Sequence, residues 1–397
     1  MNKWKTVRLG DVCEVIMGQS PKSEYYNSKG EGLPFLQGNR TFGDKYPIFD
    51  TYTTAPIKIA IAQDVIMSVR APVGDLNITP TKICLGRGVC AIRMKNNNQE
   101  FLYYLMTYYM KDILNRESGT VFGSVNKNDI DSLPVNIPED TKIQQKIGKI
   151  LKSLDDKIEL NNRINKNLEE QAMTLFDEYF PSISIGELNI GKYISPKRGK
   201  NLLSKDAISG NVPVVAGGLS PSIYHNTSNT TAPVITISAS GANAGYVNLW
   251  HIPVWSSDSS FIDSKMTPYV YFWFVMLKKR QKEIFDSQTG SAQPHIYPQN
   301  IDVMPISELD IERVKKYNNY ITPIFNLIGK NIEQSTRLAA LRDTLLPKLM
   351  SGEIDVSKVN ISIDKLSFVI LFHLKFNPPY PLPCKHTPAS VIPQLKP

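Results

Sequence analysis

The pattern of apolar and polar positions along this chain occurs twice, at an offset of 171 residues. The paired positions are Phe101 and Phe272, Lys111 and Lys282, Gly119 and Gly290, Ile130 and Ile301, and Pro134 and Pro305. Solenoid repeats span roughly 20–50 residues, so a unit of this length indicates a duplicated domain. Each copy runs into a long helical pattern, which favours a pseudo-dimer that reads a two-part target.

Each copy predicts a mixed α/β domain, the first over residues 1–137 and the second over residues 181–308. Short apolar runs rich in β-branched residues predict strands at 57–61, 65–69 and 89–92, and again at 234–237 and 246–250. Apolar residues at helical spacing predict one amphipathic helix in each copy, at 99–114 and 269–284. The expected fold class is therefore α+β.

A different period follows each domain, because apolar positions advance by alternating steps of four and three over 142–180 and 313–350. This spacing is typical of coiled-coil helices. The predicted contact positions are Ile147, Leu151, Leu154, Ile158, Asn161, Leu168, Leu175, Tyr317, Ile321, Ile324, Ile328, Asn331, Leu338 and Leu345. A buried pair of Asn161 and Asn331 would fix the register. The alternative, a single amphipathic helix lying on its own domain, explains the period but not the matching asparagines.

These helices are assigned to residues 138–180 and 309–352, and residues 353–397 form a tail that is expected to be partly disordered because it is rich in proline. The net charge of +8 is compatible with a polyanionic partner. The four cysteines lack metal-ligand spacing and the five histidines are scattered, so a metal site is not expected. The longest apolar run, 366–374, is too short to span a bilayer. A cytoplasmic protein without a signal peptide is expected.

Matching polar loops are the first candidates for nucleic-acid contact. They occupy 119–127 and 290–298 and combine glycine with hydroxyl, amide and basic side chains, which can bond to phosphates and base edges. The candidates are Ser124, Asn126, Lys127, Ser291, Gln293 and His295. The alternative is an ordinary polar loop that leads into a strand.

Basic clusters add further candidates, although each could equally be a solvated surface charge. They are Arg40, Arg70, Arg87 and Arg93 in the first copy, and Lys192, Lys197, Arg198 and Lys200 in the second. Lys22 joins them because the loop at 195–201 corresponds to the loop that ends at Lys22. The glycine-rich segment 238–245, with Ser240 and Asn243, lacks the Gly-Lys-Ser/Thr ending of a P-loop and is interpreted as a turn or a close backbone approach to DNA.

Several motifs resemble one family. Leu9-Gly-Asp-Val12, Ile130-Asp-Ser-Leu-Pro-Val135, Gln144-Gln-Lys-Ile147, Leu154-Asp-Asp-Lys-Ile158-Glu-Leu-Asn161 and Leu341-Arg-Asp-Thr-Leu-Leu-Pro-Lys-Leu-Met-Ser-Gly352 are similar to the specificity (S) subunit of type I restriction–modification systems. The resemblance covers residues 1 to about 356, and the order domain, helix, domain, helix is its most specific part.

This resemblance implies that each domain is a target recognition domain that binds one half of a bipartite, asymmetric double-stranded DNA site. The two helices would pack antiparallel as a spacer and dock two modification subunits. Those partners would carry S-adenosylmethionine chemistry on adenine, and restriction subunits would add translocation and cleavage that depend on ATP and Mg. The chain itself would hold no cofactor and catalyse nothing.

Two other functions stay open at this point. Asn377-Pro-Pro-Tyr380 matches the catalytic tetrapeptide of adenine-N6 methyltransferases, but it lacks a glycine-rich cofactor turn and lies in a proline-rich tail. A nuclease is disfavoured because Asp11, Asp64 and Asp75 are isolated in the sequence. A coiled-coil scaffold would show no salt-dependent affinity for DNA, whereas a DNA-binding subunit would.

Overall fold

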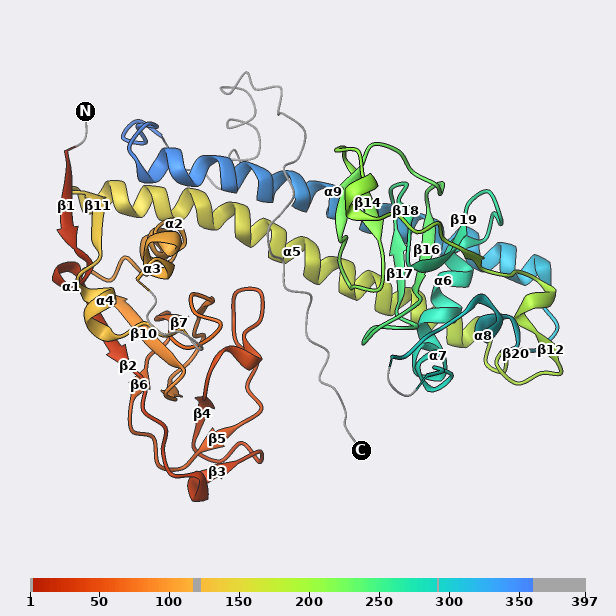
Figure 1. The fold of residues 1–397 in the computed structure, drawn as a ribbon, viewed down its shortest axis with the longest axis horizontal. Helices are drawn as coiled ribbons and strands as arrows, with labels where there is room; N and C mark the ends of the chain where they lie inside the picture. The colour runs from red at the N-terminus through yellow and green to blue at the C-terminus, as the bar shows by residue number, and fades with distance from the viewer. Residues whose placement is uncertain (1–2, 117–122, 291–292, 360–397) are drawn as a thin grey trace. The chain divides into compact units, whose positions relative to one another are not determined.

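The computed structural model describes residues 3–116, 123–290 and 293–359 (Figure 1). The described chain divides into two compact units. The first contains residues 3–116, 123–156 and 338–359, and the second contains residues 157–290 and 293–337. Each unit combines antiparallel sheets with helices, so the predicted α+β class is confirmed.

A four-stranded antiparallel sheet forms the centre of the first unit. Its order is β2 (Cys13–Met17), β10 (Val89–Met94), β7 (Val65–Ser68) and β8 (Leu76–Ile78). A second sheet has the order β3 (Tyr26–Asn27), β5 (Tyr52–Thr53), β4 (Leu33–Leu36), β9 (Ile83–Leu85) and β6 (Ile59–Ala60), with β4 and β9 parallel. The ends of the unit meet where β1 (Trp4–Arg8) pairs with β11 (Pro134–Pro138). The short helices are α1 (Leu9–Val12) and α4 (Lys127–Asp131), with 3-10 turns at Ser23–Tyr25 and Asn39–Thr41.

The second unit repeats this topology. Its central sheet has the order β13 (Lys197–Arg198), β19 (Ser259–Asp263), β16 (Val234–Ser238) and β17 (Val247–Trp250). The other strands are β15 (Ile223–His225), β14 (Val212–Val215) and β18 (Trp255–Ser256), with β14 and β18 parallel, and the closing pair of β12 (Leu188–Asn189) and β20 (Pro305–Ile306). The unit also has α8 (Pro298–Asp302) and 3-10 turns at Ile190–Lys192 and Ser204–Asp206. The duplication seen in the sequence is therefore a duplication of fold.

The helix predicted in each copy is broken in two. Residues 99–114 form α2 (Gln99–Tyr108) and α3 (Met110–Leu114). Residues 269–284 contain α6 (Val270–Lys279) and most of α7 (Gln281–Asp286). Each break falls on a residue tied to the last strand region of its unit. The Tyr109 hydroxyl accepts the Asn136 N–H at 2.8 Å, and Arg280 donates to the Pro305 carbonyl at 2.7 Å. These long-range bonds hold a bend that the amphipathic period does not reveal.

The strand predicted at 57–61 is wrong in extent, because only Ile59–Ala60 pairs in the sheet. Ile57 and Ile61 are exposed, and the Ile61 N–H instead binds the Asp64 carboxylate at 2.9 Å. A turn at this carboxylate ends the strand. The predictions at 65–69, 89–92, 234–237 and 246–250 match β7, β10, β16 and β17 within two residues.

Each unit has its own hydrophobic core, and a long helix end is part of each. In the first unit, Phe101 and Leu105 of α2 pack with Leu151 and Leu349. Val356, in the segment assigned to the tail, is buried in the same core. In the second unit Phe272 packs with the aromatic rings of Phe176 and Tyr317.

The long helices are α5 (Thr141–Tyr179) and α9 (Ile311–Met350), as the period predicts. They pair in both units and run antiparallel: as the residue numbers increase along α5, the numbers of their partners in α9 decrease. Asp155 binds Arg342 in the first unit, whereas in the second unit Asn161 binds Gln334 and Asn165 binds Asn331. These contacts exclude the alternative in which each helix lies only on its own domain. All the predicted contact positions are buried or half-buried.

The two seam asparagines do not bond to each other through their side chains. Asn161 is fully buried and donates to the Asn331 carbonyl, the Gln334 amide oxygen and the Ser335 hydroxyl. The Asn331 amide instead donates to Asn165 at 2.8 Å. The polar layer is therefore real but is shared among several residues on both helices.

Within the described residues, no helix combines the length and apolar character that crossing a membrane requires. The described part of the chain also contains no group of three or more His, Cys, Asp or Glu side chains suited to hold a metal ion.

Candidate nucleic-acid interface

Backbone hydrogen bonds gather several loops at one edge of the first unit. The Val69 N–H binds the Gly88 carbonyl at 2.9 Å, and the Val125 N–H binds the Val69 carbonyl at 3.1 Å. The Gly86 N–H binds the Leu36 carbonyl at 2.7 Å. These bonds bring together the loops after β4, β7 and β9 and the loop before α4.

The second unit builds the same edge with the same bonds. The Ala239 N–H binds the Asp258 carbonyl at 3.1 Å, and the Ile296 N–H binds the Ala239 carbonyl at 3.0 Å. The Ser257 N–H binds the Val215 carbonyl at 2.8 Å. The two units thus share one backbone arrangement at this edge, although the side chains of their loops differ.

A glycine at the end of the first central strand allows the next loop to approach in both units. A Cβ atom on Gly18 would lie 2.0 Å from the Gly86 carbonyl oxygen, and one on Gly199 would lie 2.4 Å from the Ser256 carbonyl oxygen. Only glycine fits such close backbone contact. The loops that begin at Gly18 and Gly199 are therefore fixed at corresponding places.

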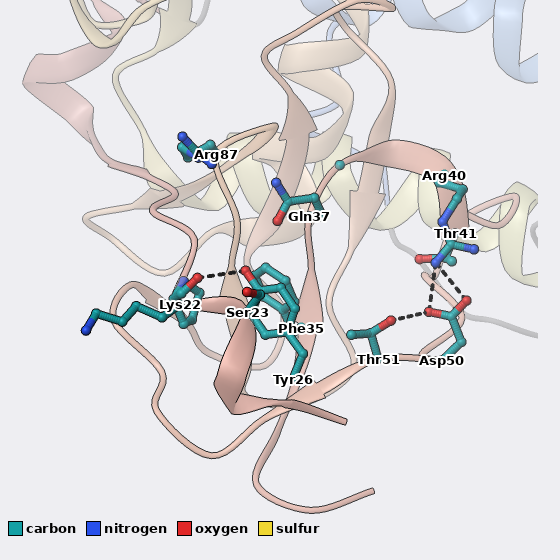
Figure 2. A pocket seen from close by; sticks show the side chains of 12 residues that line it. Lys22, Ser23, Tyr26, Phe35, Gln37, Arg40, Thr41, Asp50, Thr51 and Arg87 are labelled. Carbon is teal, nitrogen blue, oxygen red and sulfur yellow. Dashed lines mark hydrogen bonds and ion pairs between the residues drawn. The ribbon is translucent and has the colours of Figure 1, made fainter. Parts of the chain in front are cut away.

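A pocket of about 560 Å³ opens among the loops of the first unit. Three predicted residues, Lys22, Arg40 and Arg87, line it together with Gln37. Figure 2 shows Gln37 at the centre, with Lys22 and Arg87 on one side and Arg40 on the other. The pocket thus combines three cationic groups with an amide that can donate and accept.

Ion pairing orients one of these cations. Arg40 donates two hydrogen bonds to Asp50, at 2.8 and 3.0 Å, and Thr51 donates a third. Burial alone would raise the pKa of Asp50, but the bonds from Arg40 and Thr51 outweigh it and lower that pKa. Asp50 therefore stays ionised and holds Arg40 in place at the pocket. Neither Asp50 nor Gln37 was predicted from the sequence; the only signal for Gln37 was a polar residue directly after an apolar strand.

The predicted loop at 119–127 is described from residue 123, and it lies at the same edge. Ser124 forms a β-bridge with Arg70, which brings two predicted residues together. Asn126 caps α4, because its side chain accepts from the Asn128 and Asp129 N–H groups at 2.8 and 3.2 Å. The oxygen of Asn126 is therefore occupied structurally, whereas Lys127 is exposed.

The corresponding edge of the second unit carries Ser240 and His295, which form the equivalent β-bridge. The His295 ring stacks on Tyr297 with centroids 6.0 Å apart. Arg198 pairs with Asp258 at 2.6 Å, and Ser240 donates to the same carboxylate. The remaining predicted residues of this unit, apart from Asn243, are Lys192, Lys197, Lys200 and Gln293, all exposed; Ser291 lies outside the described residues. Tyr297 and Asp258 were not predicted.

Two predicted residues have structural partners that occupy their polar groups. The Asn243 amide points to the Gly217 carbonyl at 3.5 Å, inside the unit. Arg93 lies in β10 and donates two bonds to Asp64, at 2.6 and 2.8 Å. Because the Asp64 carboxylate is only 1% exposed, this pair belongs to the core and not to the loop edge. Asp64, which looks isolated in the sequence, therefore has an arginine partner in the fold.

We expect Arg93→Ala to lower the free energy of unfolding by about 3–5 kcal/mol, because it leaves the buried Asp64 carboxylate without its cation. Chemical denaturation followed by circular dichroism measures this loss. The matched control is Arg40→Ala, which breaks an exposed pair and should cost at most about 1 kcal/mol. Equal losses in the two variants would show that the Asp64 pair is not a core element.

Comparison with known proteins places this fold. Residues 1–170 match the family model described as the type I restriction modification DNA specificity domain. The match covers less than half of the 397 residues and shows that this part of the chain is similar to that family. This match confirms the resemblance drawn from the sequence motifs over residues 1–170. The tetrapeptide Asn377-Pro-Pro-Tyr380 lies outside the described residues.

Two relatives from Methanocaldococcus jannaschii illustrate the extent of the similarity. The putative type I restriction enzyme MjaX specificity subunit is 40% identical over 171 residues, which are 42% of this chain and 40% of that relative. The type I restriction enzyme MjaIX specificity subunit is 23% identical over an alignment that covers 90% of this chain and 94% of the relative. The chain thus aligns with less than half of MjaX but with nearly all of MjaIX.

A solved structure shares the fold of this chain. The S subunit of a type I restriction–modification system from M. genitalium superposes with a TM-score of 0.58 at 17% identity. The match covers 88% of this chain and 96% of that chain, so the order of domains and helices is common to both.

Proposed function

We propose that each unit of this specificity subunit reads one half of a bipartite, asymmetric DNA site. The observation that carries the proposal is the loop edge, which both units build with equivalent backbone bonds and furnish with different polar side chains. A constant frame with different side chains is what two different half-sites require, because specificity is decided by the groups that reach base edges.

The side chains at these edges suit the two kinds of DNA contact. Arginine bonds to guanine O6 and N7, and glutamine bonds to adenine N6 and N7 in the major groove. Arg87 and Gln37 in the first unit and Gln293 in the second are our candidates for base contacts. Lysine more often finds phosphate, so we assign Lys22, Lys127 and Lys200 to the backbone, with Arg70, Arg198 and Lys197 beside them. The net charge of +8 favours binding to such a polyanion.

In this proposal residues 1–137 and 181–308 are the two recognition domains, and the paired helices α5 and α9 set the distance between them. The helices also dock two modification subunits, which bring S-adenosylmethionine, and restriction subunits bring ATP-dependent cleavage with Mg. The chain supplies recognition and no cofactor. The predicted cytoplasmic location follows from this role, since such a complex acts on DNA inside the cell.

The proposal predicts two different responses at the loop edges. Gln293→Ala should cost about 1–3 kcal/mol of discrimination at one base pair, because a base-reading amide is lost. Lys127→Ala should weaken binding to all sequences and reduce the salt slope by about 1, because a phosphate contact is lost. Fluorescence anisotropy of the complex on matched and mismatched duplexes, over a series of salt concentrations, measures both.

The control for these variants is Arg337→Ala, which removes an exposed cation from α9, where it pairs with Glu333. It should leave affinity, discrimination and salt slope close to those of the parent. If Gln293→Ala behaves like this control on every duplex, Gln293 does not read a base. If no salt dependence is found for the parent, the chain does not bind DNA through phosphates.

A further inference from the structure

A partly buried polar layer joins the two long helices in the first unit. Asp155 of α5 accepts a hydrogen bond from Arg342 of α9 at 2.7 Å and one from the Tyr104 hydroxyl of α2 at 2.5 Å. The Asp155 carboxylate is 12% exposed and the Arg342 side chain 31%. Arg342 also contacts its neighbour Asp343 at 2.8 Å. We call Tyr104, Asp155 and Arg342 the charged layer.

The duplication provides a direct comparison, because each of these positions has a counterpart in the second unit. The helices repeat at an offset of 170, so Asp155 corresponds to Phe325 and Arg342 corresponds to Ala172; Tyr104 corresponds to Val275 at an offset of 171. Val275 and Ala172 are fully buried and Phe325 is 1% exposed. Phe325 stacks on Tyr271 of α6, much as Asp155 bonds to Tyr104 of α2. We call Val275, Phe325 and Ala172 the apolar layer.

The asparagine layer behaves differently from these two. Asn161 and Asn331 occupy equivalent positions and are the same residue, and only Gln334, whose counterpart is Ile164, differs strongly in polarity between the helices. This layer can fix register, as a buried polar residue in a coiled coil does, but it holds no pair of opposite charges that would distinguish α5 from α9. The charged layer can distinguish the two helices, because its acid is on α5 and its base is on α9.

From this contrast we propose that the charged layer makes the N-terminal half of the chain, residues 1–180, pair with a C-terminal half and not with a second copy of itself. If two N-terminal halves paired through α5, Ala172 of the other copy would take the place of its counterpart Arg342 and lie opposite Asp155. If two C-terminal halves paired through α9, Phe325 of the other copy would likewise lie opposite Arg342. Each like pair would therefore contain two copies of one charged residue, Asp155 or Arg342, and both copies would lack a partner of opposite charge.

Removing the partner of a largely buried charge is unfavourable, and the Asp155 carboxylate, at 12% exposed, is such a charge. An apolar layer without charges is often as stable as the pair itself. The charged layer thus adds repulsion against the wrong partner, which is how specificity between similar surfaces is achieved. Copies of this chain would then keep their halves together in spite of the duplication. This inference does not depend on DNA binding.

A cleavable full chain tests the proposal. Ile185, between the halves, is 80% exposed, so a protease site inserted after it allows the folded chain to be cut. The cut chains are mixed, partly unfolded in urea, refolded by dilution and weighed by native mass spectrometry, which separates like from unlike pairs. We expect like pairs to be at least about tenfold rarer than unlike pairs in the parent.

The layer-swap variant combines Tyr104→Val, Asp155→Phe and Arg342→Ala and so copies the apolar layer into the first unit. We expect its ratio of like to unlike pairs to rise about tenfold or more. If this variant does not refold, Asp155→Asn with Arg342→Met removes both charges at similar size, and the same rise is expected. Arg337→Ala, the exposed control on α9, should leave the ratio unchanged. Like pairs that are equally rare, or equally common, in the parent and in the charge-free variants would overturn the proposal.

Discussion

Replacing residues 1–137 with the corresponding residues of a type I specificity subunit should change one half of the recognised DNA site and leave the other half unchanged. The reason is that the first loop edge is built entirely from residues of this segment, between the loop at Gly18 and α4. On the old site the chimera should lose about 1–3 kcal/mol for each base pair that no longer matches. Sequencing the methylated sites made by the complex with its modification subunit reads the result.

The strand pairing at the ends of the segment fixes where the exchange should be made. β1 pairs with β11 from Trp4↔Pro138 to Arg8↔Pro134, so the two ends of the segment lie side by side and leave it together. Contacts that cross from the segment to α5 should be kept, among them the bond from Asn98 to Gln144 and the bond from Tyr104 to Asp155. A donor with a tyrosine at the position of Tyr104 is the matched choice, and a donor without one is the control for stability.

Three results would contradict this prediction. If both halves of the site change together, the units do not read separately. If neither half changes, the first unit does not read DNA, and the loop edge with Arg87 and Gln37 has another role. A chimera that binds the old site with unchanged affinity would likewise mean that the first unit does not read DNA.

The long helices could be predicted from the sequence because their signal is local and repeated. The 3.5-residue period over 142–180 gives α5 to within one residue at each end, and Asn161 and Asn331 lie on the seam where the period places them. The bonding of those asparagines could not be predicted. Which oxygen meets the Asn161 amide depends on the rotation of both helices, and that is decided by packing along their whole length.

The loop edges could be predicted only in part. The repeat identified the loops before α4 and α8, but the bonds that join them to other loops connect residues that are far apart in the chain, such as Val125 to Val69. Arg93 and Arg87 look alike in the sequence. Arg93 pairs with the buried Asp64, whereas Arg87 lines the pocket. Only the pairing of β10 with its neighbouring strands separates the two environments. An arginine inside an apolar strand was the one available sign of a buried pair.

The last prediction concerns the helices as a spacer. Inserting four residues after Ile158 in α5 and four after Leu338 in α9 should lengthen the non-specific spacer between the half-sites by about one or two base pairs. Four helical residues add roughly 6 Å and turn the chain by about 40° beyond a full turn. DNA advances about 3.4 Å per base pair along each strand, so the added length corresponds to that change. Both half-site sequences should stay the same.

The insertion must be made in both helices. Asp155 pairs with Arg342 on one side of the insertion points, and Asn161 bonds to Gln334 and Ser335 on the other. Four residues in α5 alone would shift one of these sets out of register and leave buried polar groups unpaired, so that variant should lose stability and is the control. Four residues in both helices keep the partners opposed and the apolar stripe nearly in phase, as a stutter does in a coiled coil. Sequencing of methylated sites decides: a stable, active double insertion with an unchanged spacer would mean that partner subunits, and not α5 and α9, set the distance.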